Sequence, residues 1–509
     1  MPWQFIDSSN NSRSNLTQVK RHVMHEYMRQ KRQDDGTQET EGKPSKSHNT
    51  RPRTKRPKAG QKTKKKSTDS TESECGQLAQ EPQSCSEISI SGQRPNSPLS
   101  QGIDYTPAIR CQLVSVFLDA YLPSVSNPHQ RIGGDFTGAL PFRLGDSPML
   151  DYAITALCAV YVGSSWQDRM LYREGVESYA RAVQCLRGCI ERSTTTQDML
   201  YVTAALQTYE VVQPSQHGMA GWSAHVQGCR ALLRHGRDGS DSALNDDELY
   251  RHMQMVIIAE AVVHRKSAYV PNPAWRPKTR TLFDQGLDFL VSGTSLMAEI
   301  RRLEQDRRRD KRTAGHRLLQ ECVRMEGELN IQYSALRSCM GFPDLWNTDE
   351  YEEHESDELE DLFFDDAFCF QSFPVAQVYS LHWATQLLTY MAIERLCCIL
   401  DEPVVPGQPS AFLFTRSYRD IIDLASSSAV MICQSVKYCF SPGMNAFGVQ
   451  VLFVRLWLAN QFYHARPGFE KEYVWCQRII RKITDSGFQG APDFMNIHWP
   501  PLRKLRNDT

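Results

Sequence analysis

The sequence predicts an all-α protein in which a large helical body follows a disordered basic N-terminal region. From about residue 104 onward, apolar residues recur at spacings of three and four, and strand-like alternation is rare. The 509 residues, 40% of them hydrophobic, hold enough apolar material for a large core. The first 66 residues carry 17 Lys/Arg against 6 Asp/Glu, although the whole chain has 58 against 59. A basic arm on an acidic body is typical of proteins that meet polyanions or transport receptors.

The body contains a series of segments with helical periodicity. Local signals agree with some of their ends: Ser147 before Pro148 is typical of an N-cap and a first-turn proline, and Gly236 after His235 is typical of a helix end. We expect residues 104–500 to form one all-helical domain. The predicted helices are 106–121, 148–162, 168–192, 197–212, 218–234, 245–265, 294–309, 313–339, 374–400, 413–438, 445–464 and 470–486.

Residues 33–103 are expected to form a disordered linker. Between 33 and 100, only 8 of 68 residues are hydrophobic and none is aromatic, so burial cannot offset the entropy of ordering. Within the linker, residues 51–66 resemble a two-cluster nuclear localisation signal. A solvated charge run that only keeps the tail extended is the alternative. The basic residues of this run are Arg51, Arg53, Lys55, Arg56, Lys58, Lys62, Lys64, Lys65 and Lys66.

Residues 1–32 hold a short motif and one predicted basic amphipathic helix at 14–32. Its basic residues lie largely off the apolar stripe, and a basic face suits contact with phosphates that is salt-dependent and independent of base sequence. A helix that packs back onto the body is an equally good interpretation. The apolar stripe consists of Leu16, Val19, Val23 and Tyr27.

An acidic insertion at 344–366 interrupts the helical pattern. It contains twelve Asp/Glu and no Lys/Arg. Acidic residues that keep aromatics solvated are typical of activation segments that dock into grooves of the transcription machinery. The alternative is an acidic surface insertion whose aromatics return to the core. The aromatics in and beside it are Phe342, Trp346, Tyr351, Phe363, Phe364, Phe368 and Phe370.

The sequence contains no catalytic, cofactor-binding or metal-binding constellation at a diagnostic spacing. There is no GxGxxG after a strand, no GxxxxGK[ST], no HExxH and no GxSxG. His22 and His25 lie on a basic arm that repels cations, and Cys185 and Cys189 are framed by apolar neighbours. We therefore expect no enzyme activity, no cofactor and no bound metal.

The chain also lacks the features of a membrane or secreted protein. Its longest nearly apolar run, residues 152–162, is far shorter than the roughly 20 residues that cross a bilayer, and no signal segment opens the chain. Fifteen cysteines are scattered along apolar helix faces, which is typical of reduced core thiols. We expect no membrane partner and no structural disulfide.

Two stretches carry a resemblance to a known family. Near the start, WQFID at 3–7 precedes Lys20, Arg21, His22, Val23 and Met24, with further basic residues after them. Between 147 and 237 there follow an apolar helix, a Tyr/Ala-rich helix, a Leu-x-x-Tyr-Glu element at 206–210 and a Trp-x-x-His-x-x-Gly element at 222–228. In these elements and their order the chain resembles fungal-specific transcription factor domain proteins, over residues 1–30 and, more loosely, 140–490.

The Trp-x-x-His-x-x-Gly element also has a plain structural interpretation. Its apolar residues share one helical face with His225, which we expect to be a structural histidine rather than a ligand or base. Gly228 is expected to permit the close approach of a neighbour. We take Trp222, His225 and Gly228 as the structural motif of this element. The shared face holds Trp222, His225, Val226, Cys229 and Leu232.

The resemblance is to the subgroup without the binuclear zinc cluster. Such a cluster needs six cysteines, the first two separated by two residues, whereas the first hundred residues hold only Cys75 and Cys85. The resemblance implies regulation of transcription in the nucleus, often of a neighbouring secondary-metabolite biosynthetic gene cluster. Only the basic arm at 20–66 is left for DNA, and backbone contacts alone do not specify bases.

Two functional hypotheses follow. The first is a nuclear transcriptional regulator that meets DNA directly through the arm or, in better agreement with the missing zinc module, through a DNA-bound partner. Its helical body would serve regulation or homodimerisation. The second is a cytosolic α-helical scaffold that binds protein partners, with the charge run merely solvating a tail.

Overall fold

The computed structural model describes residues 106–124, 132–192, 197–216, 218–235, 247–268, 277, 279–305, 311–345, 366–400 and 417–502. These residues all belong to the unit Tyr105–Thr509. The predictions for residues 1–103, including the motif at 20–24 and the basic run at 51–66, lie outside the described residues. So do residues 346–365 of the acidic insertion.

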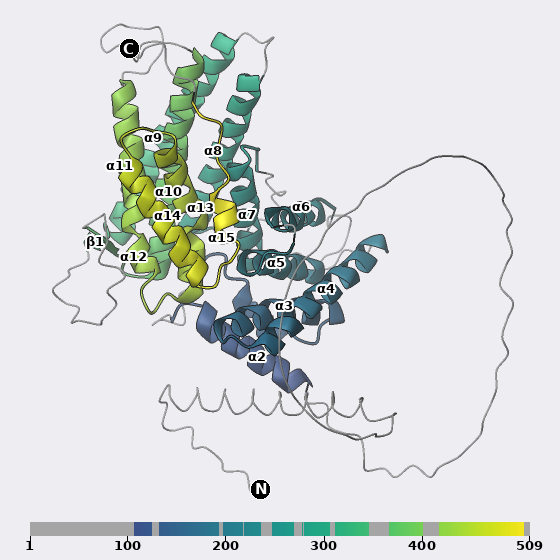
Figure 1. The fold of residues 1–509 in the computed structure, drawn as a ribbon. Helices are drawn as coiled ribbons and strands as arrows, with labels where there is room; N and C mark the ends of the chain where they lie inside the picture. The colour runs from purple at the N-terminus through teal and green to yellow at the C-terminus, as the bar shows by residue number, and fades with distance from the viewer. Residues whose placement is uncertain are drawn as a thin grey trace, which may run out of the picture. The chain divides into compact units, whose positions relative to one another are not determined.

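The described part of the chain is all-α, as its periodicity predicts (Figure 1). A 3₁₀ helix, η1 (Thr137–Arg143), and a pair of two-residue strands accompany the α-helices. The α-helices are α2 (Thr106–Tyr121), α3 (Pro148–Ser165), α4 (Arg169–Glu191), α5 (Gln197–Val212), α6 (Met219–His235), α7 (Asp247–Val263), α8 (Leu282–Gln305), α9 (Lys311–Met340), α10 (Phe373–Leu400), α11 (Tyr418–Gln434), α12 (Val436–Cys439), α13 (Asn445–His464), α14 (Glu470–Asp485) and α15 (Ala491–Met495).

Helix α10 is the central element of the fold. It contacts α8, α9, α11 and α13, and 22 of its 28 residues are buried. Helix α13 is at least as completely buried, with 17 of its 20 residues buried, which agrees with apolar residues on every side of it. Figure 1 shows α7 to α11 and α13 running roughly upright as a bundle, with α2 to α6 packed across one end. Contacts of α5 and α6 with α7, and of α2 with α13, join the two groups.

Local signals place several helix ends correctly. Ser147 caps α3 by accepting a hydrogen bond from the Leu150 backbone nitrogen at 3.4 Å, and Pro148 occupies the first turn. The predicted helix 413–438 is wrong at both ends. Helix α11 begins only after Ser417, which forms a capping box with Asp420, and it ends at Gln434, with Ser435 separating it from α12.

The predicted start of α8 is also wrong, by about three turns. The prediction began at 294, but the helix begins at Leu282. Two glycines weaken the apolar pattern of this first part, and the structure shows why they are there. A Cβ added at Gly286 would lie 2.7 Å from Leu381 Cδ2, and one at Gly293 would lie 2.9 Å from Leu388 Cδ2. The glycines therefore allow α8 to lie directly against α10.

The two short strands join the flanks of the acidic insertion. Asp344 and Leu345 of β1 (Asp344–Leu345) pair antiparallel with β2 (Phe368–Cys369). Phe368 and Phe370 are buried and pack against Trp383 of α10, with ring centroids 5.3 and 6.2 Å away. The proposal that these two aromatics stay solvated for docking is therefore wrong, because the core already covers them.

A pair of glycine substitutions in α4 tests how closely α3 and α4 pack. A Cβ at Gly175 would lie 2.7 Å from the Val160 backbone nitrogen, whereas a Cβ at Gly188 meets nothing within 4 Å. We expect Gly175→Ala to lower the free energy of unfolding by about 1–3 kcal/mol, because backbone must move. Gly188→Ala should raise it by about 0.5–1 kcal/mol through helix propensity. Urea denaturation measures both, and equal effects would contradict the packing described here.

Candidate functional site

Three of the family-like elements each contribute one residue to a polar cluster around a buried carboxylate, which we call the Glu210 cluster: Tyr179, Glu210 and His225. Glu210 of α5 is only 2% exposed and accepts hydrogen bonds from the Tyr179 hydroxyl of α4 and from the Ser215 backbone nitrogen, the latter at 2.9 Å. The same Tyr179 hydroxyl lies 2.9 Å from His225 Nε2 of α6. Since the hydroxyl donates to Glu210, it accepts from the imidazole N–H. Three helices are thus tied together through the Tyr179 hydroxyl.

Burial sets the electrostatics of this cluster. It lowers the pKa of His225, against a smaller opposing effect of the Glu210 charge. It also raises the pKa of Tyr179, helped by the hydrogen bond to Glu210 and by its charge. His225 is therefore a neutral imidazole whose Nε2 ties α6 to Tyr179 of α4.

The close approach predicted at Gly228 occurs at a different glycine. The nearest atom to a Cβ at Gly228 is Thr203 Cγ2 at 3.7 Å, which is ordinary contact, so that prediction is wrong. A Cβ at Gly221 would lie 2.8 Å from the Glu210 carboxylate. Gly221 is the residue that lets α6 lie on the buried carboxylate. Leu232 of the predicted face is only half-buried, whereas Leu233, which was not assigned to that face, is buried.

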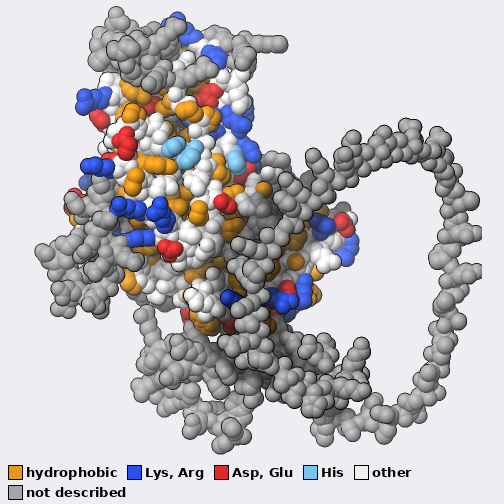
Figure 2. Space-filling model, in the orientation of Figure 1, with side chains coloured by type: hydrophobic (Ala, Val, Ile, Leu, Met, Phe, Trp, Pro, Cys, Tyr) orange, Lys and Arg blue, Asp and Glu red, His pale blue; other side chains and the backbone are white. Residues whose placement is uncertain are grey.

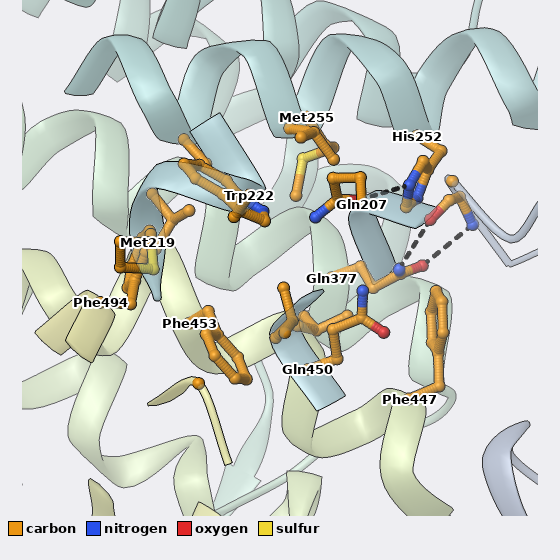
Figure 3. A pocket seen from close by; sticks show the side chains of 18 residues that line it. Gln207, Met219, Trp222, His252, Met255, Gln377, Phe447, Gln450, Phe453 and Phe494 are labelled. Atoms are coloured by element: carbon orange, nitrogen blue, oxygen red, sulfur yellow. Dashed lines mark hydrogen bonds between the residues drawn. The ribbon is translucent and has the colours of Figure 1, made fainter. Parts of the chain in front are cut away.

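Next to this cluster lies a cavity of about 100 Å³ between the two groups of helices. Helices α5, α6, α7, α10, α13 and α15 line it, together with Gly133 and Gly134 ahead of η1. Figure 3 shows Trp222, Met219, Phe453 and Phe494 along one side, and His252 and Gln377 on the other. The cavity therefore has an apolar wall, of which Trp222 is part, and a polar end.

The polar end is held by an ordered set of hydrogen bonds. Gln377 of α10 accepts from the Gly133 backbone nitrogen at 3.1 Å and donates to its carbonyl oxygen at 3.0 Å. The Gly134 nitrogen donates to Glu248 Oε2 at 2.8 Å. His252 Nε2 of α7 lies 3.1 Å from Gln207 Oε1 of α5. Both side-chain groups of Gln377 are thereby occupied.

Two other glutamines present free donors. Because Gln207 Oε1 accepts from His252, its amide nitrogen lies on the opposite side, turned toward Trp222 and Met255 (Figure 3). Gln450 of α13 likewise accepts the Tyr121 hydroxyl through Oε1. Neither amide nitrogen has a hydrogen-bond partner among the residues described by the structure. Gln207 is only 3% exposed, so its unused donor is costly to leave unpaired.

The described residues that line the cavity carry no charge. His252 is the one titratable residue among them, and burial lowers its pKa to about 3 against a weaker effect of the Gly134 backbone. The imidazole is therefore neutral at physiological pH, and its Nε2 is hydrogen-bonded to Gln207. Such a lining can bind and orient a molecule, but it holds no charged group for acid–base or nucleophilic chemistry.

Sequence reasoning found only part of this site. It singled out Trp222, but not Gln207, His252, Gln377 or Gln450. Each of these four is a polar residue within a run of apolar helix residues, for example Gln207 in LYVTAALQTYEVV, and that contrast is the signal that would have revealed them. The predicted site residues at 20–24 and 51–66 lie outside the described part of the chain.

Other chemistry is not apparent in the described ranges. They contain no group of three or more His, Cys, Asp or Glu arranged to hold a metal ion. Their thirteen cysteines are free thiols, including Cys185 and Cys189. None of the described helices combines the length and apolar character needed to cross a lipid bilayer.

Comparison with protein-family models, with curated proteins and with solved structures finds no match. Function must therefore be argued from the chain itself.

Replacing Tyr179 tests the Glu210 cluster. We expect Tyr179→Phe to lower the free energy of unfolding by about 1–3 kcal/mol, because buried Glu210 and His225 both lose a partner. Tyr172 is on the same helix, and its hydroxyl makes no hydrogen bond to any described residue, so Tyr172→Phe should change stability by less than about 0.5 kcal/mol. Chemical denaturation measures the free energy of unfolding of both variants. A small loss of stability for Tyr179→Phe would show that Glu210 does not depend on the Tyr179 hydroxyl.

The buried neutral His252 predicts a specific dependence of stability on pH. Its pKa is about 3 in the folded chain and about 6.5 when unfolded, so the unfolded state binds the extra proton. The stabilisation is complete above pH 6.5 and is lost as pH falls toward 3. Between pH 6 and 5, we expect wild type to lose about 1.4 kcal/mol per pH unit more than His252→Gln. Denaturation at several pH values gives the free energy of unfolding of both proteins as a function of pH. If the two curves ran parallel, a buried neutral imidazole at His252 would be contradicted.

Proposed function

We propose that this protein is a nuclear transcriptional regulator whose helical body is the regulatory and interaction domain. The observation that carries the proposal is the Glu210 cluster. The Tyr/Ala-rich helix, the Leu-x-x-Tyr-Glu element and the Trp-x-x-His-x-x-Gly element supply Tyr179, Glu210 and His225, and these side chains meet. The elements on which the family resemblance rests thus form one structural unit, and we take this as support for the proposal.

The basic run at 51–66 supplies nuclear entry and contact with polyanions in this proposal. On the face drawn in Figure 2, basic and acidic side chains of the described helices are interspersed, and this face offers no continuous basic surface for a nucleic acid. Arg324 of α9, for example, forms exposed ion pairs with Glu321 and Glu328. The arm is therefore the better site for phosphate contact.

Target choice comes from a DNA-bound partner in this proposal, since a basic arm contacts phosphates without reading bases. The gene set is that of a fungal secondary-metabolite cluster, as the resemblance implies. The acidic insertion at 344–366 is the proposed contact to the transcription machinery, through the aromatics other than Phe368 and Phe370. A homodimer formed through the helical body is part of the same hypothesis.

Neutralising the basic run tests the proposal. We expect a full-length fluorescent fusion to accumulate in the nucleus, and replacement of all nine basic residues at 51–66 by Gln to shift it to the cytosol, because import receptors recognise the charge cluster. The matched control replaces Lys20, Arg21, Arg29, Lys31 and Arg32, which should leave import intact. Quantitative imaging compares the nuclear-to-cytosolic ratios.

Chromatin enrichment gives the second readout. The tagged full chain should be enriched at a limited set of promoters, and a chain that starts at residue 101 should lose this enrichment. Cytosolic fluorescence of the intact chain, together with unchanged transcript levels after gene deletion, would instead favour the α-helical scaffold.

A further inference from the structure

We infer that the cavity beside Trp222 is a binding site for a small, uncharged, mostly apolar organic molecule that carries a hydrogen-bond acceptor such as a carbonyl oxygen. The acceptor binds the amide nitrogens of Gln207 and Gln450, and the apolar part lies against the aromatic wall. This inference concerns binding alone and does not depend on the proposed role in transcription.

The need for an acceptor follows from the unpaired donors. Gln207 is 3% exposed, its oxygen is bonded to His252, and its nitrogen is directed into the cavity (Figure 3). The Gln450 nitrogen lies on the same cavity, and its oxygen is bonded to Tyr121. Gln207 is buried and Gln450 is half-buried, so both nitrogens face the cavity rather than bulk water, and a carbonyl oxygen there, with two lone pairs, can accept from such donors.

The absence of charge in the lining determines the charge of the ligand. A bound carboxylate would find no cation in the lining, and a bound amine would find no anion, so either would lose its hydration without compensation. The cation of α13, Arg455, is not part of the lining. Its guanidinium is used by the backbone carbonyl oxygens of Val451 and Gln377. A neutral acceptor is the group that this environment stabilises.

The wall and the volume determine the size and character of the rest of the ligand. Trp222, Phe453 and Phe494 are all less than 10% exposed and present ring faces and edges, with Trp222 and Phe494 5.7 Å apart in an edge-to-face pair. The cavity of about 100 Å³ is smaller than the apolar protein cavity of about 150 Å³ that binds benzene, but it is partly open to solvent, so a ring-sized molecule fills it and extends toward the opening. An aromatic or cyclic ketone has this chemistry.

Three probes of similar size test the roles of the ring, the neutral acceptor and the charge of the ligand separately. Acetophenone has both a ring and a neutral acceptor, ethylbenzene lacks the acceptor, and benzoate carries a charge. We expect saturable binding of acetophenone to the purified full chain, measured by calorimetry and by a rise in melting temperature. Ethylbenzene should bind about three- to tenfold more weakly, which is the effect of one neutral hydrogen bond. Benzoate should not bind measurably.

Two glutamine variants then test the assignment of the donor. Gln207→Met removes the donor in the cavity, and Gln332→Met is the matched control, because Gln332 makes the same kind of bond to His382, at 3.1 Å, but does not line the cavity. Both variants lose a buried Gln–His bond. Only Gln207→Met should lose the preference for acetophenone over ethylbenzene, while Gln332→Met should keep it.

A third variant keeps the test decisive if Gln207→Met does not fold. Ala259 lines the cavity and is 6% exposed, so Ala259→Leu fills the space with apolar volume and should abolish binding of acetophenone. Failure of acetophenone to bind wild type up to its solubility limit would overturn the inference and leave a water-filled cavity. Equal probe preferences in both glutamine variants, or tighter binding of benzoate, would overturn it as well.

Discussion

The burial of helix α10 on every side is the constraint on which the rest of this structure depends. A helix with no exposed face must satisfy each of its polar side chains internally. Thr385 and Thr389 do so by donating to carbonyl oxygens four residues earlier, both at 2.8 Å. His382 reaches Gln332 of α9, and Glu394 is bound by Arg466 and Tyr418. The surrounding helices are thus held in place by hydrogen bonds as well as by apolar contact.

The charged groups buried around α10 each require an oppositely charged partner. Burial lowers the pKa of Arg466 to about 9, so its guanidinium stays charged at neutral pH and depends on Glu394 for compensation. Removing one partner of such a pair leaves an uncompensated buried charge, at a cost of about 3–5 kcal/mol. The described lining of the cavity beside Trp222 is neutral, and the amide nitrogens of Gln207 and Gln450 on it have no partner among the described residues. Unpaired nitrogens also occur on α10 itself, at His382 Nε2 and Trp383 Nε1, so it is the space beside the two glutamines that makes the cavity the inferred ligand site.

The parts of the fold that could be predicted from sequence are those whose causes lie in neighbouring residues. Helix α2 has the predicted bounds, and α3 begins at its predicted cap, because periodicity and capping involve neighbouring residues only. The first turns of α8 were not predicted, because Gly286 and Gly293 weaken the apolar pattern there. The two glycines leave room for two leucines of α10 that are distant in the sequence. The assignment of close approach to Gly228 instead of Gly221 failed for the same reason. Nothing near either glycine in the sequence reveals that Glu210 lies opposite one of them.

The sequence by itself determined the all-helical class, most helix positions, the apolar face that contains Trp222 and the separation of a basic arm from the body. These properties follow from composition and from spacings within one or two helical turns. Only the tertiary structure decided that Gln207, His252, Gln377 and Gln450 share one cavity, and that Tyr179, Glu210 and His225 share one set of hydrogen bonds. A polar residue in an apolar helix shows that a partner is needed. Which partner it has depends on how helices far apart in the chain pack together.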